Sequence, residues 1–197
     1  MLQFKKLNKK NQTAWDTYVL SHPDAEIFHL WQWCCIYQES YGYTPHYHLI
    51  YDEEFVVGVL PLIHQKGWFK NILVSPPSGL LLNQVDKFKT EVFNFIIQVQ
   101  KQCNAEDVVL YNNYCLSDTM YVSFENARIK KHLPDSEAEL LKGIGKKHRY
   151  AINMANKHAL HHDVLKPDKK GVAMFFQLYA TNYRDLGTPV NAKRFFE

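Results

Sequence analysis

The sequence predicts an α+β fold in which a mixed β-sheet is flanked by helices. Three observations support this prediction. Mostly apolar runs at 47–51 and 55–63 flank a short acidic turn, which is typical of a β-hairpin. Residues 85–103 carry apolar side chains at helical spacing, which indicates a long amphipathic helix. The strand–helix–helix order expected for 1–41 recurs in 162–197. The chain is therefore expected to contain one complete unit and the beginning of a second, similar one.

Composition limits the class of protein. The chain has 197 residues, of which 46% are apolar and 14% aromatic, so it can bury a large core. The net charge of +3 is low for a dedicated nucleic-acid binder. No run approaches the roughly 18 apolar residues of a membrane span, and the N-terminus lacks the apolar segment of a signal peptide. Four cysteines without a Cys-x-x-Cys pair predict free thiols and a cytoplasmic location.

The first elements are expected in the order strand, helix, helix. Residues 2–7 predict a short strand. Asn11 or Thr13 can cap a helix that ends near Pro23, because the residue before a proline disfavours helix. Residues 27–41 predict a second helix, closed by Gly42 as its C-cap.

The middle of the chain should supply the sheet. Pro61 lies late in the second hairpin strand and predicts an edge or a bulge there. The helix at 85–103 should bury Phe88, Val92, Phe95, Ile96 and Val99. The remaining expected strands are 72–74, 79–82, 107–111 and 120–124.

Residues 134–161 predict one connecting amphipathic helix with a basic face. Ser136 and Glu139 form a capping-box pattern. Gly143 and Gly145 weaken this helix and indicate a kink or a close approach. The expected apolar stripe is Leu140, Leu141, Ile144, His148, Ala151, Ile152, Ala155 and Ala159. The basic face consists of Lys142, Lys146, Arg149, Asn153 and Lys157. Two interpretations stay open: a solvated charged face, or a surface that meets an anionic partner through residues such as Lys146 and Arg149.

The last part of the chain predicts a strand at 162–165, a helix at 172–186 that ends at Gly187, and a new helical pattern at 191–197. The chain stops inside that pattern and is expected to be a truncated form of a longer protein. The expected domains are therefore a first lobe, 1–133, the connecting helix, 134–161, and an incomplete second lobe, 162–197.

Several motifs resemble one protein family. They are Trp15-Asp16, Ser21 to Ala25, Phe28-His29, Tyr41 to Tyr43, Gly58 to Leu62, Lys147 to Ile152, and Tyr179 to Val190 followed by Lys193 to Phe196. Together they resemble the FemABX acyltransferases, which have a GNAT-like fold in two lobes, and in particular the FemAB-related branch associated with PEP-CTERM and exosortase systems. The run Arg-Asp-Leu-Gly-Thr-Pro-Val at 184–190 is the most specific of these motifs.

The resemblance implies an N-acyltransferase. Members of the family move an amino acid from aminoacyl-tRNA to an amine of a peptidoglycan precursor, and the PEP-CTERM branch is linked to exopolysaccharide. An anionic donor or acceptor, such as tRNA or a cell-wall precursor, is the implied partner. The chain departs from that branch at 76–81, where Pro-Pro-Ser-Gly-Leu-Leu replaces an aromatic and two glycines. This departure changes the expected acceptor cleft around Ser78.

The polar residues near the end of the 172–186 helix are the candidate site. Arg184 is expected to hold a carboxylate or phosphate, and Asp185 to orient the amine. Asn182 and Thr188 are further candidate substrate-binding residues. The alternative for all four is a structural helix end, in which Gly187 supplies the left-handed cap, Pro189 stops the helix and Arg184 pairs with Asp185 or a neighbour.

No resident cofactor or metal is expected. The segments before residues 85 and 107 lack the glycine-rich turn that binds the pyrophosphate of acetyl-CoA, so an aminoacyl-tRNA donor is favoured. Gly143 to Lys147 is only half a phosphate loop. His158 and His162 have helical spacing but lack the further ligands of a zinc site.

Two other functions stay open beside acyl transfer. A non-catalytic domain could bind a glycan or peptide in an aromatic-lined cleft, because the chain has 12 Tyr, 12 Phe and 4 Trp. A third function is contact with RNA through the basic residues 142–157, which would show a steep dependence of affinity on salt.

Overall fold

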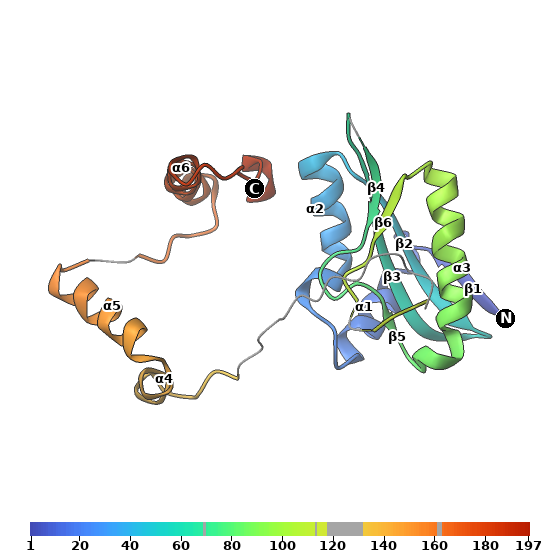
Figure 1. Cartoon of the computed structure of the whole chain (residues 1–197), viewed down its shortest axis with the longest axis horizontal. Coiled ribbons are helices and arrows are strands. Elements are labelled where there is room, and N and C mark those ends of the chain that lie inside the picture. Colours follow the sequence, from blue (N-terminus) through green and yellow to red (C-terminus); the bar gives the residue numbers. More distant parts are fainter. Residues whose placement is uncertain (69, 113, 118–131, 161–162) are drawn as a thin grey trace. The chain divides into compact units, whose positions relative to one another are not determined.

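The computed structural model describes residues 1–68, 70–112, 114–117, 132–160 and 163–197 (Figure 1). The described residues among 1–120 and 174–197 form one compact unit, and those among 121–173 form a second. The strands are β1 (Leu2–Lys6), β2 (Thr44–Asp52), β3 (Phe55–Lys66), β4 (Asn71–Val74), β5 (Leu81–Leu82) and β6 (Asp107–Val109). The helices are α1 (Gln12–Ser21), η1 (Ile27–His29), α2 (Trp31–Tyr41), α3 (Val85–Cys103), α4 (Glu137–Gly143), α5 (Lys146–Lys157), α6 (Lys169–Asp185) and η2 (Lys193–Phe195).

The six strands form one mixed sheet in the order β1-β2-β3-β4-β6, with β5 paired to β3. All neighbours are antiparallel except β4 and β6, which are parallel. A parallel pair needs a crossover connection, and α3 provides it between β4 and β6. The predicted mixed sheet with flanking helices is therefore present.

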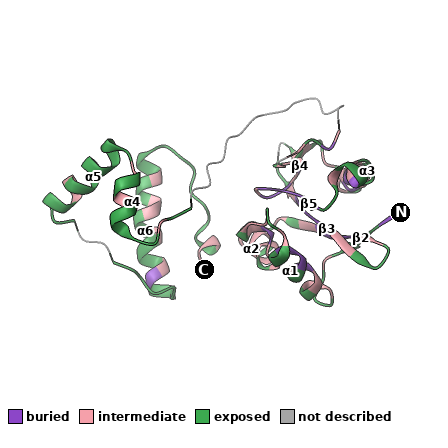
Figure 2. Ribbon diagram, turned by 90° about the horizontal axis from the view of Figure 1, so that it is seen from below, coloured by how far each residue is buried: buried purple, intermediate pink, exposed green. Residues whose placement is uncertain are grey.

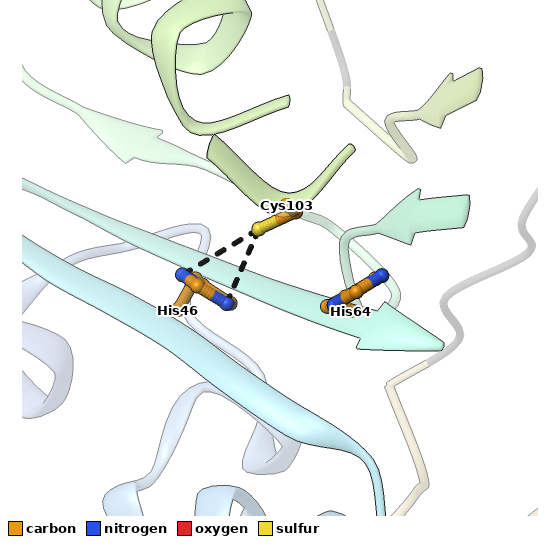
Figure 3. A group of neighbouring side chains, drawn as sticks. All are labelled: His46, His64 and Cys103. Atoms are coloured by element: carbon orange, nitrogen blue, oxygen red, sulfur yellow. Dashed lines mark hydrogen bonds between the residues drawn. The ribbon is translucent and has the colours of Figure 1, made fainter. Parts of the chain in front are cut away.

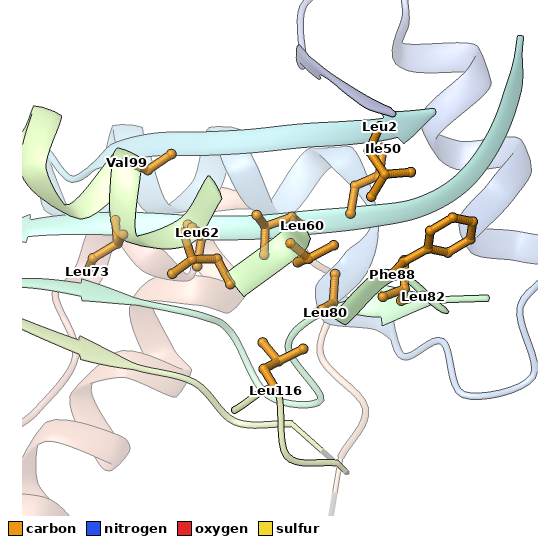
Figure 4. Packing of buried hydrophobic residues seen from close by; sticks show 12 residues of the cluster. Leu2, Ile50, Leu60, Leu62, Leu73, Leu80, Leu82, Phe88, Val99 and Leu116 are labelled. Carbon is orange, nitrogen blue, oxygen red and sulfur yellow. The ribbon is translucent and has the colours of Figure 1, made fainter. Parts of the chain in front are cut away.

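Side-chain alternation along β3 divides the core between the two faces of the sheet. Leu60 and Leu62 face α3, whereas Val59 and Ile63 face α1 and α2. Figure 4 shows the α3 side, where Leu60 and Leu62 meet Val99 and Leu73. On the other face, Trp15 stacks on Tyr47 with ring centroids 5.3 Å apart. Because β3 is covered on both faces, its sequence is an almost unbroken apolar run.

Several predicted elements agree closely with the structure. The α3 helix has the predicted bounds and buries Phe88, Val92, Ile96 and Val99, while Phe95 stacks on Phe4 with centroids 3.8 Å apart. Gly42 and Gly187 take left-handed backbone angles, φ +68° and +65°, at the ends of α2 and α6. All four cysteines are free thiols, as predicted. None of the described helices is long and apolar enough to cross a membrane.

The predicted helix at 27–41 is interrupted at Leu30, which is extended at ψ 143°. Glu26 and His29 close the short η1 turn with reciprocal caps, and α2 then begins at Trp31. The Trp31 N–H donates to Asp16 Oδ1 at 3.2 Å. This contact comes from α1, so spacing within 27–41 could not reveal the break.

The predicted single helix at 134–161 is also wrong, because the chain forms two helices. Ser136 caps α4, and its Oγ accepts from the Glu139 N–H at 3.3 Å. The chain is then extended at Ile144 and Gly145, with ψ of 152° and 155°, before α5 begins. Neither helix contains a buried residue, so both are mostly green and pink in Figure 2. The residues of the expected apolar stripe are thus half-buried or exposed, and none is buried.

Other expectations are corrected or fall outside the described residues. Pro61 lies in an interior strand, between the parts of β3 that pair with β5 and with β4, and the bulge is at Ile50/Tyr51 instead. Residues 163–165 form no strand. Only the short η2 turn forms within 191–197. The predicted strand at 120–124 lies outside the described residues.

Candidate functional site

The carboxyl ends of the parallel strands β4 and β6 lie at the same edge of the sheet. The Ser75 N–H donates to the Val109 carbonyl at 2.9 Å, and the Tyr111 N–H donates to Ser75 Oγ at 2.9 Å. In open sheets, ligands bind outside the carboxyl ends of parallel strands. The described residues of the two segments that leave these strands, 75–80 on one side and 110–112 with 114 on the other, are therefore the candidate site, and we call the first of them the 75–80 loop.

The 75–80 loop has an unusual backbone at Ser78 and Gly79. Both residues have positive φ, 62° and 45° respectively, a region that disfavours side chains larger than glycine. A Cβ on Gly79 would clash with Asn112 Oδ1 and lie 3.0 Å from Ser75 Oγ. Such close approach of polar groups to a glycine holds the loop in one conformation.

The side chains of Asn112 and Tyr114 bind the loop at Leu80. The Leu80 N–H donates to Asn112 Oδ1 at 3.0 Å, and the Tyr114 hydroxyl donates to the Leu80 carbonyl at 2.9 Å. Burial is the main cause that raises the pKa of Tyr114, so its hydroxyl keeps the proton that it donates.

His29 holds the other side of the loop. The imidazole is fully buried, and its Nε2 lies 3.0 Å from the Gly79 carbonyl. Its Nδ1 accepts the Glu26 N–H at 2.9 Å, so Nε2 carries the proton and donates to Gly79. Burial is the main cause that lowers the pKa of His29, which keeps the ring neutral. His29 is a positioning residue for the loop.

Among the predicted site residues, Ser78 lies within this loop and is buried, with 5% of its surface exposed. His29 belongs to the Phe28-His29 motif that resembles the family, but the sequence predicted no role for it. Its partner Gly79 is 50 residues away in the chain, and no local pattern predicts a contact over that separation.

Arg184 and Asp185 form an ion pair at the end of α6. The Arg184 Nε and Nη2 donate to Asp185 Oδ1 at 3.1 and 3.0 Å, and both side chains are mostly exposed. Asn182 and Thr188 form backbone hydrogen bonds that close the end of α6. The Asn182 carbonyl accepts from Leu186, and the Thr188 N–H donates to Tyr183. The sequence predicted this structural arrangement as the alternative to a substrate-facing one.

Lys146 and Arg149 lie on α5, in the unit formed by the described residues among 121–173. Arg149 does not extend freely from the basic face. Its Nη1 donates to the Ile144 carbonyl at 2.6 Å and to the Leu141 and Lys142 carbonyls at 3.3 Å. It thus caps the carbonyls at the end of α4, whereas Lys146 is exposed.

A groove of about 570 Å³ lies between α2 and the last residues of the chain. It is lined by Cys35, Ile36, Glu39, Ser40 and residues 194–197. Ring contacts of Phe195 with Trp33 and Tyr41 close one side, with centroids 5.9 and 5.7 Å apart. None of the predicted site residues lines this groove.

One solved structure shows the fold. The crystal structure of FemX matches 99% of this chain with a TM-score of 0.63 at 16% sequence identity, and the match covers 53% of FemX. The chain therefore spans about half the length of FemX. A possible acetyltransferase from Clostridium difficile 630 is a weaker match, with a TM-score of 0.38, 10% identity, and coverage of 68% of this chain and 99% of that one. No protein-family model matches the chain, and no curated protein matches it.

The chain thus has a FemX-like α/β fold, as the resemblance to the FemAB group implied.

Proposed function

We propose that this chain is part of a FemAB-like N-acyltransferase, which transfers an aminoacyl or acyl group to an amine of a cell-envelope glycan or peptide. The observation that carries the proposal is the FemX-like fold over 99% of the chain. The two-lobe organisation, with a first lobe at 1–133 and the opening of a second at 162–197, belongs to the same proposal. The assignment to the PEP-CTERM-associated branch rests on the sequence motifs at 15–62 and 179–196.

Acyl transfer to an amine needs a neutral amine, a held carbonyl and an acceptor for the proton. An ester-linked aminoacyl donor is already activated, so positioning supplies much of the rate. In this proposal the 75–80 loop shapes the acceptor cleft, because its backbone is fixed by His29 and Asn112.

Arg184 and Asp185 are the proposed substrate-contacting pair. Their ion pair is exposed, and exposed pairs contribute little stability, so a substrate carboxylate or phosphate can replace Asp185 on the guanidinium. The released Asp185 carboxylate would then orient the amine. The bidentate geometry of arginine suits such an exchange.

The decisive experiment is an acyl-transfer assay of the natural full-length protein. Charged tRNA or acetyl-CoA serves as donor, an amine-bearing muropeptide as acceptor, and the mass of the acceptor is measured. We expect transfer from charged tRNA, and its loss in R184A and D185A with unchanged melting temperature. The matched control is Lys66→Ala, at the exposed end of β3. Loss of folding in R184A and D185A would instead assign the pair a structural role.

The donor class is tested separately by calorimetry. We expect no micromolar binding of acetyl-CoA to the purified chain, because the expected pyrophosphate-binding turn is missing from the sequence. Micromolar binding would refute the proposed donor class while leaving acyl transfer itself intact.

The exposed cations of α5 support contact with an RNA donor. Lys146 and Lys157 are exposed and are the ends of this helix. If they neutralise phosphates, tRNA affinity should fall steeply as the salt concentration rises. In K146A, the slope of log affinity against log salt concentration should be smaller by about one. Salt-insensitive binding, or the same slope in K146A and in the Lys66→Ala control, would count against this contact.

A further inference from the structure

His46, His64 and Cys103 bring three metal-binding side chains together on one face of the sheet (Figure 3). His46 comes from β2 and His64 from β3, and the register pairs Thr44 with His64 and His46 with Leu62. The two imidazoles are therefore diagonal neighbours on the face that α3 covers. Cys103 is the last residue of α3 and packs against the core on that face.

The ligand atoms are close enough for one ion. One ring nitrogen of each imidazole and the Cys103 sulfur all lie within 4.8 Å of one another. Cys103 Sγ lies 3.3 Å from His46 Nε2. Zinc bonds of about 2.1 Å to nitrogen and 2.3 Å to sulfur place tetrahedral ligand atoms about 3.5 Å apart. Small rotations of the side chains would therefore bring all three to bonding distance.

One of the imidazoles has an unused buried nitrogen. Nε2 of His64 is buried and has no hydrogen-bond partner among the described residues. A buried polar atom without a partner is costly, so its presence needs an explanation. The Cys103–His46 contact leaves this nitrogen without a partner, whereas a metal ion bound through Nε2 of His64 would satisfy it.

The end of α3 favours a cation and the backbone of one ligand is held in place, whereas the nearby charge of Lys6 opposes a cation. Cys103 lies at the C-terminal end of α3, where the helix dipole is negative. The His46 carbonyl accepts a hydrogen bond from Nδ1 of His48 at 3.0 Å, which fixes the backbone of one ligand. All three side chains are partly buried, so they are shielded from water yet accessible to an ion.

We propose that His46, His64 and Cys103 form a zinc site, with a fourth position open to water or an exchangeable ligand. Two imidazoles and a thiolate suit a tetrahedral zinc ion. The Cys103 thiol loses its proton to solvent when the metal binds, which leaves the ion with one net positive charge. The site would join the end of α3 to β2 and β3. It goes beyond the proposed acyl transfer and does not depend on it.

A nucleophilic Cys–His pair is the competing explanation of the same contact. A reactive cysteine needs a pKa below its usual value. Burial is the main cause that raises the pKa of Cys103, and the opposing effect of Lys6 is smaller. A nucleophilic pair would also leave Nε2 of His64 unexplained.

The first test uses the untagged, reduced wild-type chain and needs no variant. Alkylation of Cys103 and of Cys115 is followed by mass spectrometry with and without zinc. Cys115 is an exposed thiol in the same chain and serves as the internal control. With free zinc at 100 times its dissociation constant, Cys103 should react about a hundredfold more slowly, because about 1% of the sites are then empty. Equal protection of both thiols, or none, would overturn the proposal.

The second test identifies the ligands with cobalt as a spectroscopic probe. One equivalent of Co²⁺ should give a thiolate-to-cobalt charge-transfer band in the metal-free chain, and zinc should abolish it. The band should be lost in C103S, weakened in H46Q and H64Q, and unchanged in C115S. A band that persists in C103S would overturn the site. If H64Q fails to fold, the alkylation experiment on the wild-type chain decides the question.

Discussion

The buried imidazole of His29 gives the candidate site a dependence on pH. Burial lowers the pKa of His29 from 6.5, so the unfolded chain binds more protons than the folded chain below that pH. The stability that neutral His29 contributes is therefore complete above the unfolded value and is lost as the pH falls through it. His22 shares this sign, because burial also lowers its pKa.

We predict that H29Q reduces this dependence. Between about pH 8 and pH 5, the wild-type free energy of unfolding should fall more than that of H29Q, because glutamine does not titrate. Urea unfolding at several pH values measures both slopes. The same substitution at exposed His158 serves as the control and should keep the wild-type slope. Equal slopes for H29Q and wild type would show that His29 does not carry the effect.

Arg149 should stabilise the end of α4. Its guanidinium binds three carbonyls at the end of α4, so R149A leaves those acceptors to water. We predict roughly two- to tenfold faster amide exchange across α4 in R149A. K146A removes a cation from α5, the helix that carries Arg149, but it removes no cap from α4. It should therefore leave the amide exchange of α4 unchanged. Hydrogen–deuterium exchange by mass spectrometry distinguishes the two variants.

At the scale of elements, two glycines with the same backbone requirement differ in their surroundings. Gly42 and Gly79 both have positive φ, but a Cβ on Gly42 would meet nothing within 4 Å. A Cβ on Gly79 would meet Asn112, Ser75 and the Tyr111 carbonyl. Replacing Gly42 by alanine therefore measures backbone strain alone, whereas replacing Gly79 by alanine adds a steric clash.

We predict that G42A lowers the free energy of unfolding by about 1 kcal/mol. G79A should lower it by at least about 3 kcal/mol, because the loop must shift away from Asn112. Urea denaturation of the two variants under the same conditions gives the difference. If G79A costs no more than G42A, the 75–80 loop is less tightly held than its contacts indicate.

Local patterns predicted the elements whose cause is local. The apolar spacing of α3 gave its bounds, and the glycines at 42 and 187 gave two helix ends. The break at Leu30 was missed because its cause is the contact of Trp31 with Asp16 on another helix. The break at Ile144 and Gly145 was signalled by the glycines at 143 and 145. The sequence did not predict that the backbone there is extended, or that Arg149 donates to the Ile144 carbonyl.

On the scale of the whole molecule, burial is very uneven. The α3 helix buries Phe88, Val92, Ile96 and Val99 against the sheet, whereas α5 buries no residue. Helices in proteins gain most of their stability from tertiary packing, and regions with few buried contacts open at low free energy.

We predict that backbone amides of α5 exchange at least about a hundredfold faster than those in the middle of α3. Hydrogen–deuterium exchange of the intact chain measures both helices in one sample. Added tRNA supplies a further comparison, since binding by α5 would slow its exchange and leave α3 unchanged. Equal protection of α3 and α5 without RNA would contradict the prediction.

The fold class could be predicted because it depends on elements and their order, whereas the sites depend on distant pairs. His29 meets Gly79 across 50 residues, and His46 meets Cys103 across 57. The register of β2 and β3 brings His46 and His64 to one face, and that register also depends on a bulge at Ile50/Tyr51. The predicted roles of Ser78, Lys146, Arg149, Asn182, Arg184, Asp185 and Thr188 stay predictions.

The first strand of the sheet has a consequence for the order of folding. Among the described strands, β1 pairs with β2 alone, and its partners run from Leu2 with Asp52 to Lys6 with His48. The β2–β3 hairpin closes over a short turn, but β1 must close the long loop that contains α1 and α2, which costs more entropy. During synthesis β1 therefore pairs with β2 only after the β2–β3 hairpin has formed. Until β1 pairs, the outer edge of β2 is open to pairing with other chains.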